Sequence, residues 1–113
     1  MDGTTTLAEL KGLVGQFVSE RKWEKFHSPK NLSMAIATEA AELMDLFIWL
    51  TENESEDAAK AALAQAATEE LADVVIFALA FANHCSIDLT EAVMDKLAKN
   101  REKYPAQEFQ GRV

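Results

Sequence analysis

Four acidic residues stand where two helical segments should be apolar. In the first segment, residues spaced alternately three and four apart read Leu32, Ala35, Glu39, Glu42, Leu46 and Trp49. In the second, the same spacing reads Leu63, Ala66, Glu70, Asp73, Phe77, Ala80 and His84. Residues at this spacing share one helix face. Because ionised groups buried without partners are very costly, we infer that a cation lies among these four carboxylates.

The ligand types indicate which cation this is. One acidic pair would say little, because such pairs occur on many solvated helices, but here the pattern occurs twice with apolar residues on both sides. Hard oxygen donors favour Mg²⁺, Mn²⁺ or Ca²⁺ over Zn²⁺. A di-iron bundle would carry Glu-x-x-His, whereas the last positions here are Glu42 and Asp73. We therefore expect Mg²⁺, with Mn²⁺ as a substitute.

Bound Mg²⁺ indicates phosphate chemistry, because it usually keeps several waters and binds substrate phosphates as well as carboxylates. The expected reaction is metal-assisted hydrolysis of a phosphate ester or anhydride. In this interpretation Glu39, Glu42, Glu70 and Asp73 are both metal ligands and catalytic residues, and one of them can double as general base.

Aromatic residues near these segments suggest a base-binding site. Trp23 precedes the first acidic segment and Trp49 ends it, and flat side chains of this kind stack on nucleobases. The alternative is that both tryptophans are core or interface anchors. Phe77 is by default a core residue, His27 by default a surface histidine, and His84 by default a partner for the carboxyl end of its helix.

A basic group near the carboxyl end offers a second phosphate contact. Its members are Lys96, Lys99, Asn100, Arg101, Lys103 and Tyr104. They could clamp a polyphosphate, or they could only complement the dipole at the end of a helix.

The composition predicts an all-α fold. The 113 residues include 4 Gly and 2 Pro and show no alternating strand pattern. Helices are expected over residues 5–22, 28–50, 55–84 and 88–102, with Ser28, Ser55 and Asp88 as N-caps and Pro29 at the first helical position. An irregular tail follows from about residue 103. The expectation is one domain, residues 1–113, folded as an antiparallel four-helix bundle.

The second and third predicted helices are apolar beyond one face. The segment from Val74 to Ala82 has almost no polar residue, and a helix apolar all round must be buried all round. A chain of this length cannot bury two such helices alone, so we expect an obligate homo-oligomer.

The net charge limits the kinds of partner that we expect for this protein. A net charge of −8 argues against binding a nucleic-acid polymer, which needs a basic face. No apolar run is long enough for a membrane span, the polar start does not look like a signal peptide, and the lone Cys85 indicates a reducing compartment. We expect a cytoplasmic protein that does not bind membranes.

The acid pairs and the segments around them resemble the MazG-like nucleotide pyrophosphohydrolases, and in particular the short dCTP pyrophosphatases and integron-associated MazG proteins. The resemblance extends over roughly residues 7–105 and combines the E-x-x-E and E-x-x-D motifs with Trp-x-x-Phe-His and Lys-Tyr-Pro segments. It implies an all-α enzyme, usually a tetramer built as a dimer of dimers. The implied reaction hydrolyses a (deoxy)nucleoside triphosphate, dCTP among the substrates, to the monophosphate and pyrophosphate.

Individual residues carry this resemblance. The four acids match the Mg²⁺ ligands of the family, and Trp23 and Trp49 match residues that hold the base. Positions near the substrate are matched by His27, Lys30, Asn31, Lys96, Asn100, Arg101, Lys103 and Tyr104. The chain departs from the family at Phe77, where relatives often carry Tyr, and at Val14, where some carry His. Two other interpretations stay open: a dUTPase-like hydrolase on the same scaffold, and a non-catalytic dimerisation or regulatory module.

Overall fold

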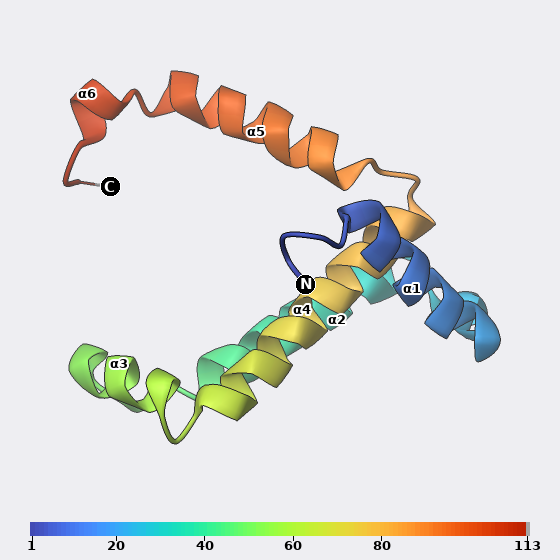
Figure 1. Ribbon diagram of the computed structural model, residues 1–113, viewed down its shortest axis with the longest axis horizontal. Helices are drawn as coiled ribbons and strands as arrows, with labels where there is room; N and C mark the ends of the chain where they lie inside the picture. The colour runs from blue at the N-terminus through green and yellow to red at the C-terminus, as the bar shows by residue number, and fades with distance from the viewer. Residues whose placement is uncertain (113) are drawn as a thin grey trace.

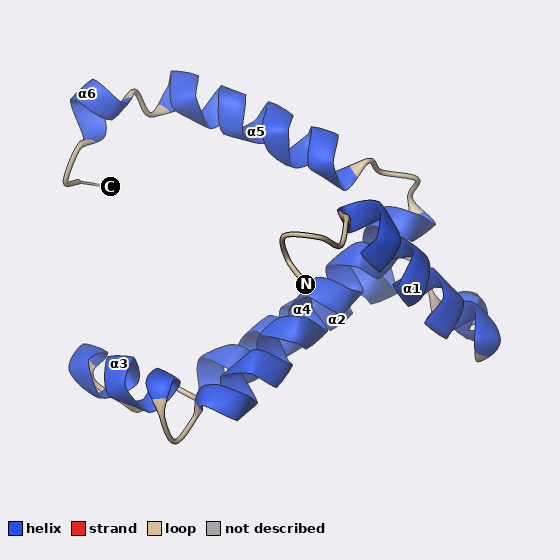
Figure 2. Cartoon of the chain, in the orientation of Figure 1, coloured by secondary structure: helices blue, strands red, loops and turns tan. Residues whose placement is uncertain are grey.

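The protein is described here by a computed structural model, which covers residues 1–112. Six α-helices follow one another along the chain, with one turn of 3-10 helix, η1 (Trp23–Phe26), after the first (Figure 1). They are α1 (Leu7–Glu20), α2 (Pro29–Asp45), α3 (Glu52–Lys60), α4 (Ala64–His84), α5 (Leu89–Lys103) and α6 (Ala106–Phe109). The part of the chain described contains no strand (Figure 2), which confirms the all-α prediction.

Two of the predicted helix starts are confirmed. The Ser28 hydroxyl accepts a hydrogen bond from the Asn31 backbone N–H at 3.0 Å, and Pro29 is the first residue of α2. Asp88 likewise accepts from the Glu91 backbone N–H at 2.9 Å. Each cap satisfies a backbone donor that has no partner inside its own helix, and so fixes where that helix begins.

The predicted helix over residues 55–84 is wrong. Residues 52–60 form α3, and the N-cap is Thr51 rather than Ser55, because Thr51 and Glu54 exchange side-chain-to-backbone hydrogen bonds in a capping box. The chain breaks after Lys60, where Ala61 leaves helical geometry (φ −134°, ψ −97°). The Leu63 backbone N–H then bonds back to the Ala58 carbonyl, and α4 starts afresh.

Two further boundaries differ from the prediction. Helix α2 ends at Asp45 and not near residue 50, because the backbone tightens into three-residue turns in which the Phe47 N–H donates to the Met44 carbonyl and the Leu50 N–H to the Phe47 carbonyl. The carboxyl tail, predicted as irregular, contains the short helix α6.

The packing of the single chain rests on α4. Helix α2 runs alongside it, and α1 crosses near its carboxyl end (Figure 1). Among residues 1–112 the buried hydrophobic side chains are only Leu32, Leu79, Ala80 and Ala82. Large apolar residues stay exposed on several helices, including Leu71 of α4 (54%) and Met94 of α5 (64%). The core of one chain is therefore small for its length.

The predicted four-helix bundle is not formed within one chain. Helix α5 leaves the end of α4 at 103° and runs apart from the α2–α4 pair (Figure 1). The turn between them contains Ser86 in the left-handed region (φ 55°), which redirects the chain before α5 begins. Within residues 1–112 no single helix has both the length and the apolar character to cross a membrane; α4 and α5 reach that limit only when taken together.

The direction of α5 is held by a contact from α1. The Lys11 ammonium donates to the Ile87 carbonyl in the turn at 2.7 Å, in a partly buried setting. The Asn83 side-chain amide donates to the Lys11 carbonyl at 2.9 Å. Lys11 of α1 therefore contacts the turn through its ammonium group and the end of α4 through its carbonyl oxygen.

We predict that Lys11→Met lowers the free energy of unfolding by about 1–3 kcal/mol, because a partly buried carbonyl loses its charged donor. The measurement is a urea unfolding midpoint by circular dichroism. Lys99→Met, at an exposed position on α5, serves as the matched control and should change stability little. Equal effects of the two substitutions would show that the Lys11 bond contributes nothing.

Candidate metal centre

The packing of α2 along α4 brings the two acid pairs together. Glu39 and Glu42 lie on α2, and Glu70 and Asp73 lie on α4. One carboxylate oxygen from each of Glu39, Glu70 and Asp73 lies within 4.8 Å of the other two. Three carboxylates this close together could hold one divalent cation between α2 and α4.

Two of these oxygens have no partner in the protein. Glu39 Oε2 and Glu70 Oε2 are both buried, and neither accepts a hydrogen bond. Buried polar atoms are nearly always paired, and an unpaired carboxylate oxygen is among the most costly to leave unsatisfied. The oxygens are hard donors that face one another, so the group fits a divalent cation.

Crowding also raises the proton affinity of the site. The pKa of Glu39 rises to about 7, chiefly because its protonated form hydrogen bonds to the Glu42 carboxyl, and further because of burial and the negative charges of Glu42, Asp73 and Glu70. Burial raises the pKa of Glu70, and the Glu42 carboxyl adds to this by hydrogen bonding and by charge. Glu42 thus raises the pKa of one carboxyl on each helix. It is not one of the three residues whose oxygens lie within 4.8 Å of one another.

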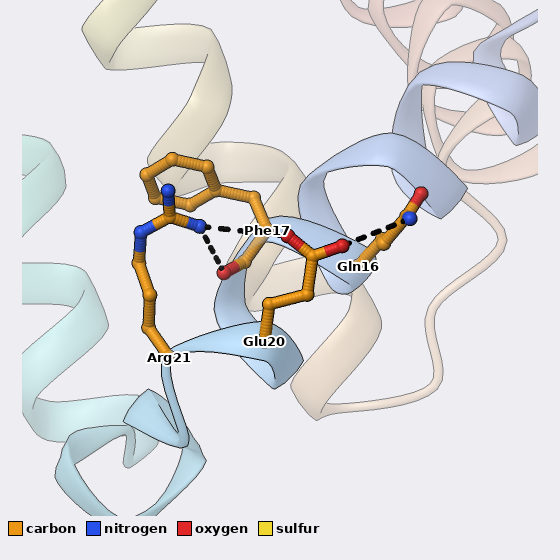
Figure 3. Close-up of polar contacts among 4 residues, drawn as sticks. All are labelled: Gln16, Phe17, Glu20 and Arg21. Atoms are coloured by element: carbon orange, nitrogen blue, oxygen red, sulfur yellow. Dashed lines mark hydrogen bonds and ion pairs between the residues drawn. The ribbon is translucent and has the colours of Figure 1, made fainter.

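The residues predicted to hold the base are placed apart from one another. Trp23 lies in η1 with its ring edge-on to Phe17, 5.6 Å between centroids. The Arg21 guanidinium lies over the Phe17 ring, 3.7 Å from its centroid, and donates to the Phe17 carbonyl (Figure 3). Trp49 follows the end of α2 and is 91% exposed, so its role in base binding stays a prediction.

The other predicted substrate residues fall into two sets. Near the start of α2, the Asn31 side chain donates to the Phe26 carbonyl at 3.0 Å, which orders the loop that carries His27; Lys30 is exposed. Lys96, Asn100, Arg101 and Lys103 lie on α5 and Tyr104 caps it, and α5 diverges from the acid-bearing pair (Figure 1). Within one chain, these basic residues therefore do not lie next to the four carboxylates. Phe77 lies on α4, four residues after Asp73.

Sequence reasoning missed a pocket at the other end of the same α4 face. It lies between α1, η1 and α4, and His27 and His84 both line it. The signal was present, because His84 continues the row of residues that carries Glu70 and Asp73. His84 was nevertheless interpreted only as a helix-end partner.

Comparison with known proteins adds independent information. The model of the MazG-like family matches residues 34–112. Mouse dCTP pyrophosphatase 1 is 42% identical over 101 residues, covering 88% of this chain, and the human protein is 42% identical over 102 residues, covering 89%. The crystal structure of a pyrophosphatase from Archaeoglobus fulgidus superimposes with a TM-score of 0.83 at 36% identity, covering 88% of this chain and 92% of that one.

The chain spans only part of the mammalian relatives. The alignments cover 59% of the mouse protein and 60% of the human one. The similarity therefore extends across most of this chain, while about two-fifths of each mammalian protein has no counterpart in it.

Protons and a divalent cation should compete for the carboxylates. In the folded chain Glu39 holds a proton up to about pH 7, against an ordinary pKa of 4.5. The folded state binds more protons than the unfolded state between these values, so stability falls as pH rises through the window. We predict that the melting temperature without metal falls from pH 5 to pH 8, and that millimolar MgCl₂ raises it more at pH 8.

The variant Glu39→Gln is the control for this experiment. It keeps a group that can bond to Glu42 but removes the titrating charge, so the fall with pH and the gain from MgCl₂ should both shrink. A Mg²⁺ effect of the same size at pH 5 and pH 8 in the unmodified chain would contradict the assignment.

Proposed function

The chain belongs to the MazG-like family, and we propose that it is a Mg²⁺-dependent nucleoside triphosphate pyrophosphohydrolase. The proposed reaction converts a (deoxy)nucleoside triphosphate and water to the monophosphate and pyrophosphate. Two observations together support the proposal. Glu39 and Glu70 each have a buried carboxylate oxygen without a partner, and one carboxylate oxygen from each of Glu39, Glu70 and Asp73 lies within 4.8 Å of the other two. Deoxycytidine triphosphate is the first substrate to test, since the mammalian relatives are named for it.

The four carboxylates would hold the metal between α2 and α4, and their positions define the reacting end of the substrate. When bound, Mg²⁺ neutralises charge on the phosphates and lowers the pKa of a bound water. One of the four carboxylates accepts a proton from the attacking water. The water oxygen bonds to the α-phosphorus, the α–β anhydride bond breaks, and pyrophosphate leaves. Removal of unwanted nucleotides is the cellular role we propose.

Two other functions remain to be separated by experiment. A dUTPase-like enzyme would use the same acids, so the base preference decides between the two. A non-catalytic dimerisation module would not need to keep four carboxylates in register on two helices. Residues 1–113 are proposed to form one domain of this family, and the cytoplasmic location stays a prediction from sequence.

We predict that Asp73→Asn and Glu42→Gln each lower kcat by more than about 100-fold. The loss of a residue outside the ligand shell of a metal typically costs about 10–100-fold, and a ligand should cost more. The assay follows pyrophosphate and monophosphate release from a panel of nucleoside triphosphates with MgCl₂. Glu56→Gln, exposed on α3, is the charge-matched control. Release of inorganic phosphate in place of pyrophosphate would contradict the proposed reaction.

The active enzyme is proposed to be a homo-oligomer, with a dimer of dimers as the expected form. Its support is the extent of apolar surface that one chain leaves exposed, on α4 at Leu71, Val75 and Ile76 and on α5 at Val93, Met94 and Leu97. Exposed apolar patches of this extent are typical of interaction surfaces. Because α5 extends away from its own carboxylates, we propose that its basic residues serve the site of another copy.

A complementation experiment tests this arrangement. Asp73→Asn and the double variant Lys96→Ala, Arg101→Ala should each be nearly inactive alone. If α5 serves a neighbouring subunit, unfolding and refolding a mixture restores activity, because some mixed oligomers contain an intact site. Activity that stays at the level of the separate variants would place the α5 residues on their own carboxylates. Native mass spectrometry verifies that mixed oligomers have formed, because the two variant chains differ in mass.

A further inference from the structure

A row of exposed apolar residues follows one side of α2. Its members are Met34, Ala37, Ala41 and Met44. All four are exposed, Met34 to 57% and Met44 to 52%. They are spaced three, four and three residues apart, which places them on one face of the helix. We call this row the α2 stripe.

The α2 stripe lies on the side of the helix opposite the metal centre. Glu39 is two residues from Ala37 and two from Ala41, and two residues correspond to about 200° around a helix. Glu39 groups with two acids of α4, along which α2 packs (Figure 1). The stripe therefore points away from α4, and an apolar face of this kind is buried when a partner covers it.

The α2 stripe has the same residues in both directions along the helix. Met, Ala, Ala and Met at spacings of three, four and three residues read identically from either end. A second copy of α2 running in the opposite direction would place Met34 against Met44 and Ala37 against Ala41. Such a surface is self-complementary about a twofold axis, as in the commonest protein dimers. The small alanines at the centre let two helices approach closely, and the flexible methionines fill the space on either side.

Charged residues at the two ends of the stripe favour this antiparallel direction. Lys30 lies four residues before Met34, and Asp45 lies four residues after Ala41, so both border the stripe. Both are exposed, and within residues 1–112 neither forms an ion pair. In an antiparallel pair, Lys30 of each copy lies within one helical turn of Asp45 of the other. A parallel pair would instead bring like charges together at each end, which is unfavourable.

We propose that α2 pairs antiparallel with α2 of a second copy through the α2 stripe, about a twofold axis level with Glu39. The inference deepens the proposed function and rests on the homo-oligomer proposed there. A dimer of dimers needs two different interfaces, and the exposed apolar residues of α4 and α5 would form the other one. Each α2 would then be held on one side by α4 and on the other by the second copy.

Disulfide cross-linking tests the direction of the pair. In a Cys85→Ser background, the double variant Ala37→Cys, Ala41→Cys should form disulfides between chains, because these two positions face each other in the antiparallel pair. Cysteines must lie close together to form this bond, so Ala37→Cys alone and Ala41→Cys alone should cross-link at least 10-fold less. Glu56→Cys on α3 measures random encounters, and gel electrophoresis without reductant gives the cross-linked fraction.

Two outcomes of the cross-linking experiment would overturn the proposal. Efficient cross-linking of Ala37→Cys alone would show that the helices run parallel. Cross-linking of the double variant no greater than that of Glu56→Cys would show that the two stripes do not meet.

A charge placed within the stripe gives a test that needs no disulfide. Ala41→Glu should lower the mass of the oligomer twofold, because a carboxylate would be buried in the helix pair without a partner. Ala59→Glu adds the same charge at an exposed alanine of α3 and should leave the mass unchanged. Light scattering measures the mass, and circular dichroism establishes that both variants fold. Equal masses for the two variants overturn the proposal.

These measurements use no nucleotide, so they separate the α2 pair from the proposed reaction. A chain that forms the expected cross-link and hydrolyses no nucleoside triphosphate would support the pair and contradict the reaction. The variant Leu97→Glu on α5 separates the pair from the other interface. A twofold loss of mass in Leu97→Glu with none in Ala41→Glu would support an oligomer formed through α5 and overturn the α2 pair.

Discussion

The unmet negative charge between α2 and α4 is the constraint on which the site depends. Packing two helices along acid-bearing faces leaves carboxylate oxygens of Glu39 and Glu70 buried and unpaired. The protein can relieve this by binding protons, and the pKa of Glu39 rises accordingly to about 7, or by binding a cation. A cation placed among these oxygens would satisfy them, so the cost of leaving them unpaired would favour cation binding.

The distribution of apolar surface connects the site to assembly. One chain buries few large side chains, while α4 and α5 expose residues such as Leu71 and Met94. The turn at Ser86, tied by Lys11, sends α5 away from the helices that carry the acids. If a second copy covers these apolar faces, as proposed, the same contact would bring the basic end of α5 towards the carboxylates of its partner.

Helix α4 carries acids of the candidate metal centre and also lines a separate pocket at its carboxyl end. Glu70 and Asp73 lie near its amino-terminal half, and Ala80, Asn83 and His84 line the pocket at its end.

The sequence alone determined the helical class, the caps at Ser28 and Asp88, and the four acids, because helical periodicity and capping are local properties. It did not determine the break after Lys60 or the end of α2 at Asp45, where hydrogen bonds of the turns compete with those of a longer helix. Only the tertiary structure decided that α5 diverges from the other helices and that His27 and His84, far apart in sequence, line one pocket. Periodicity places a residue on a face of its own helix, but the packing of helices decides which faces meet.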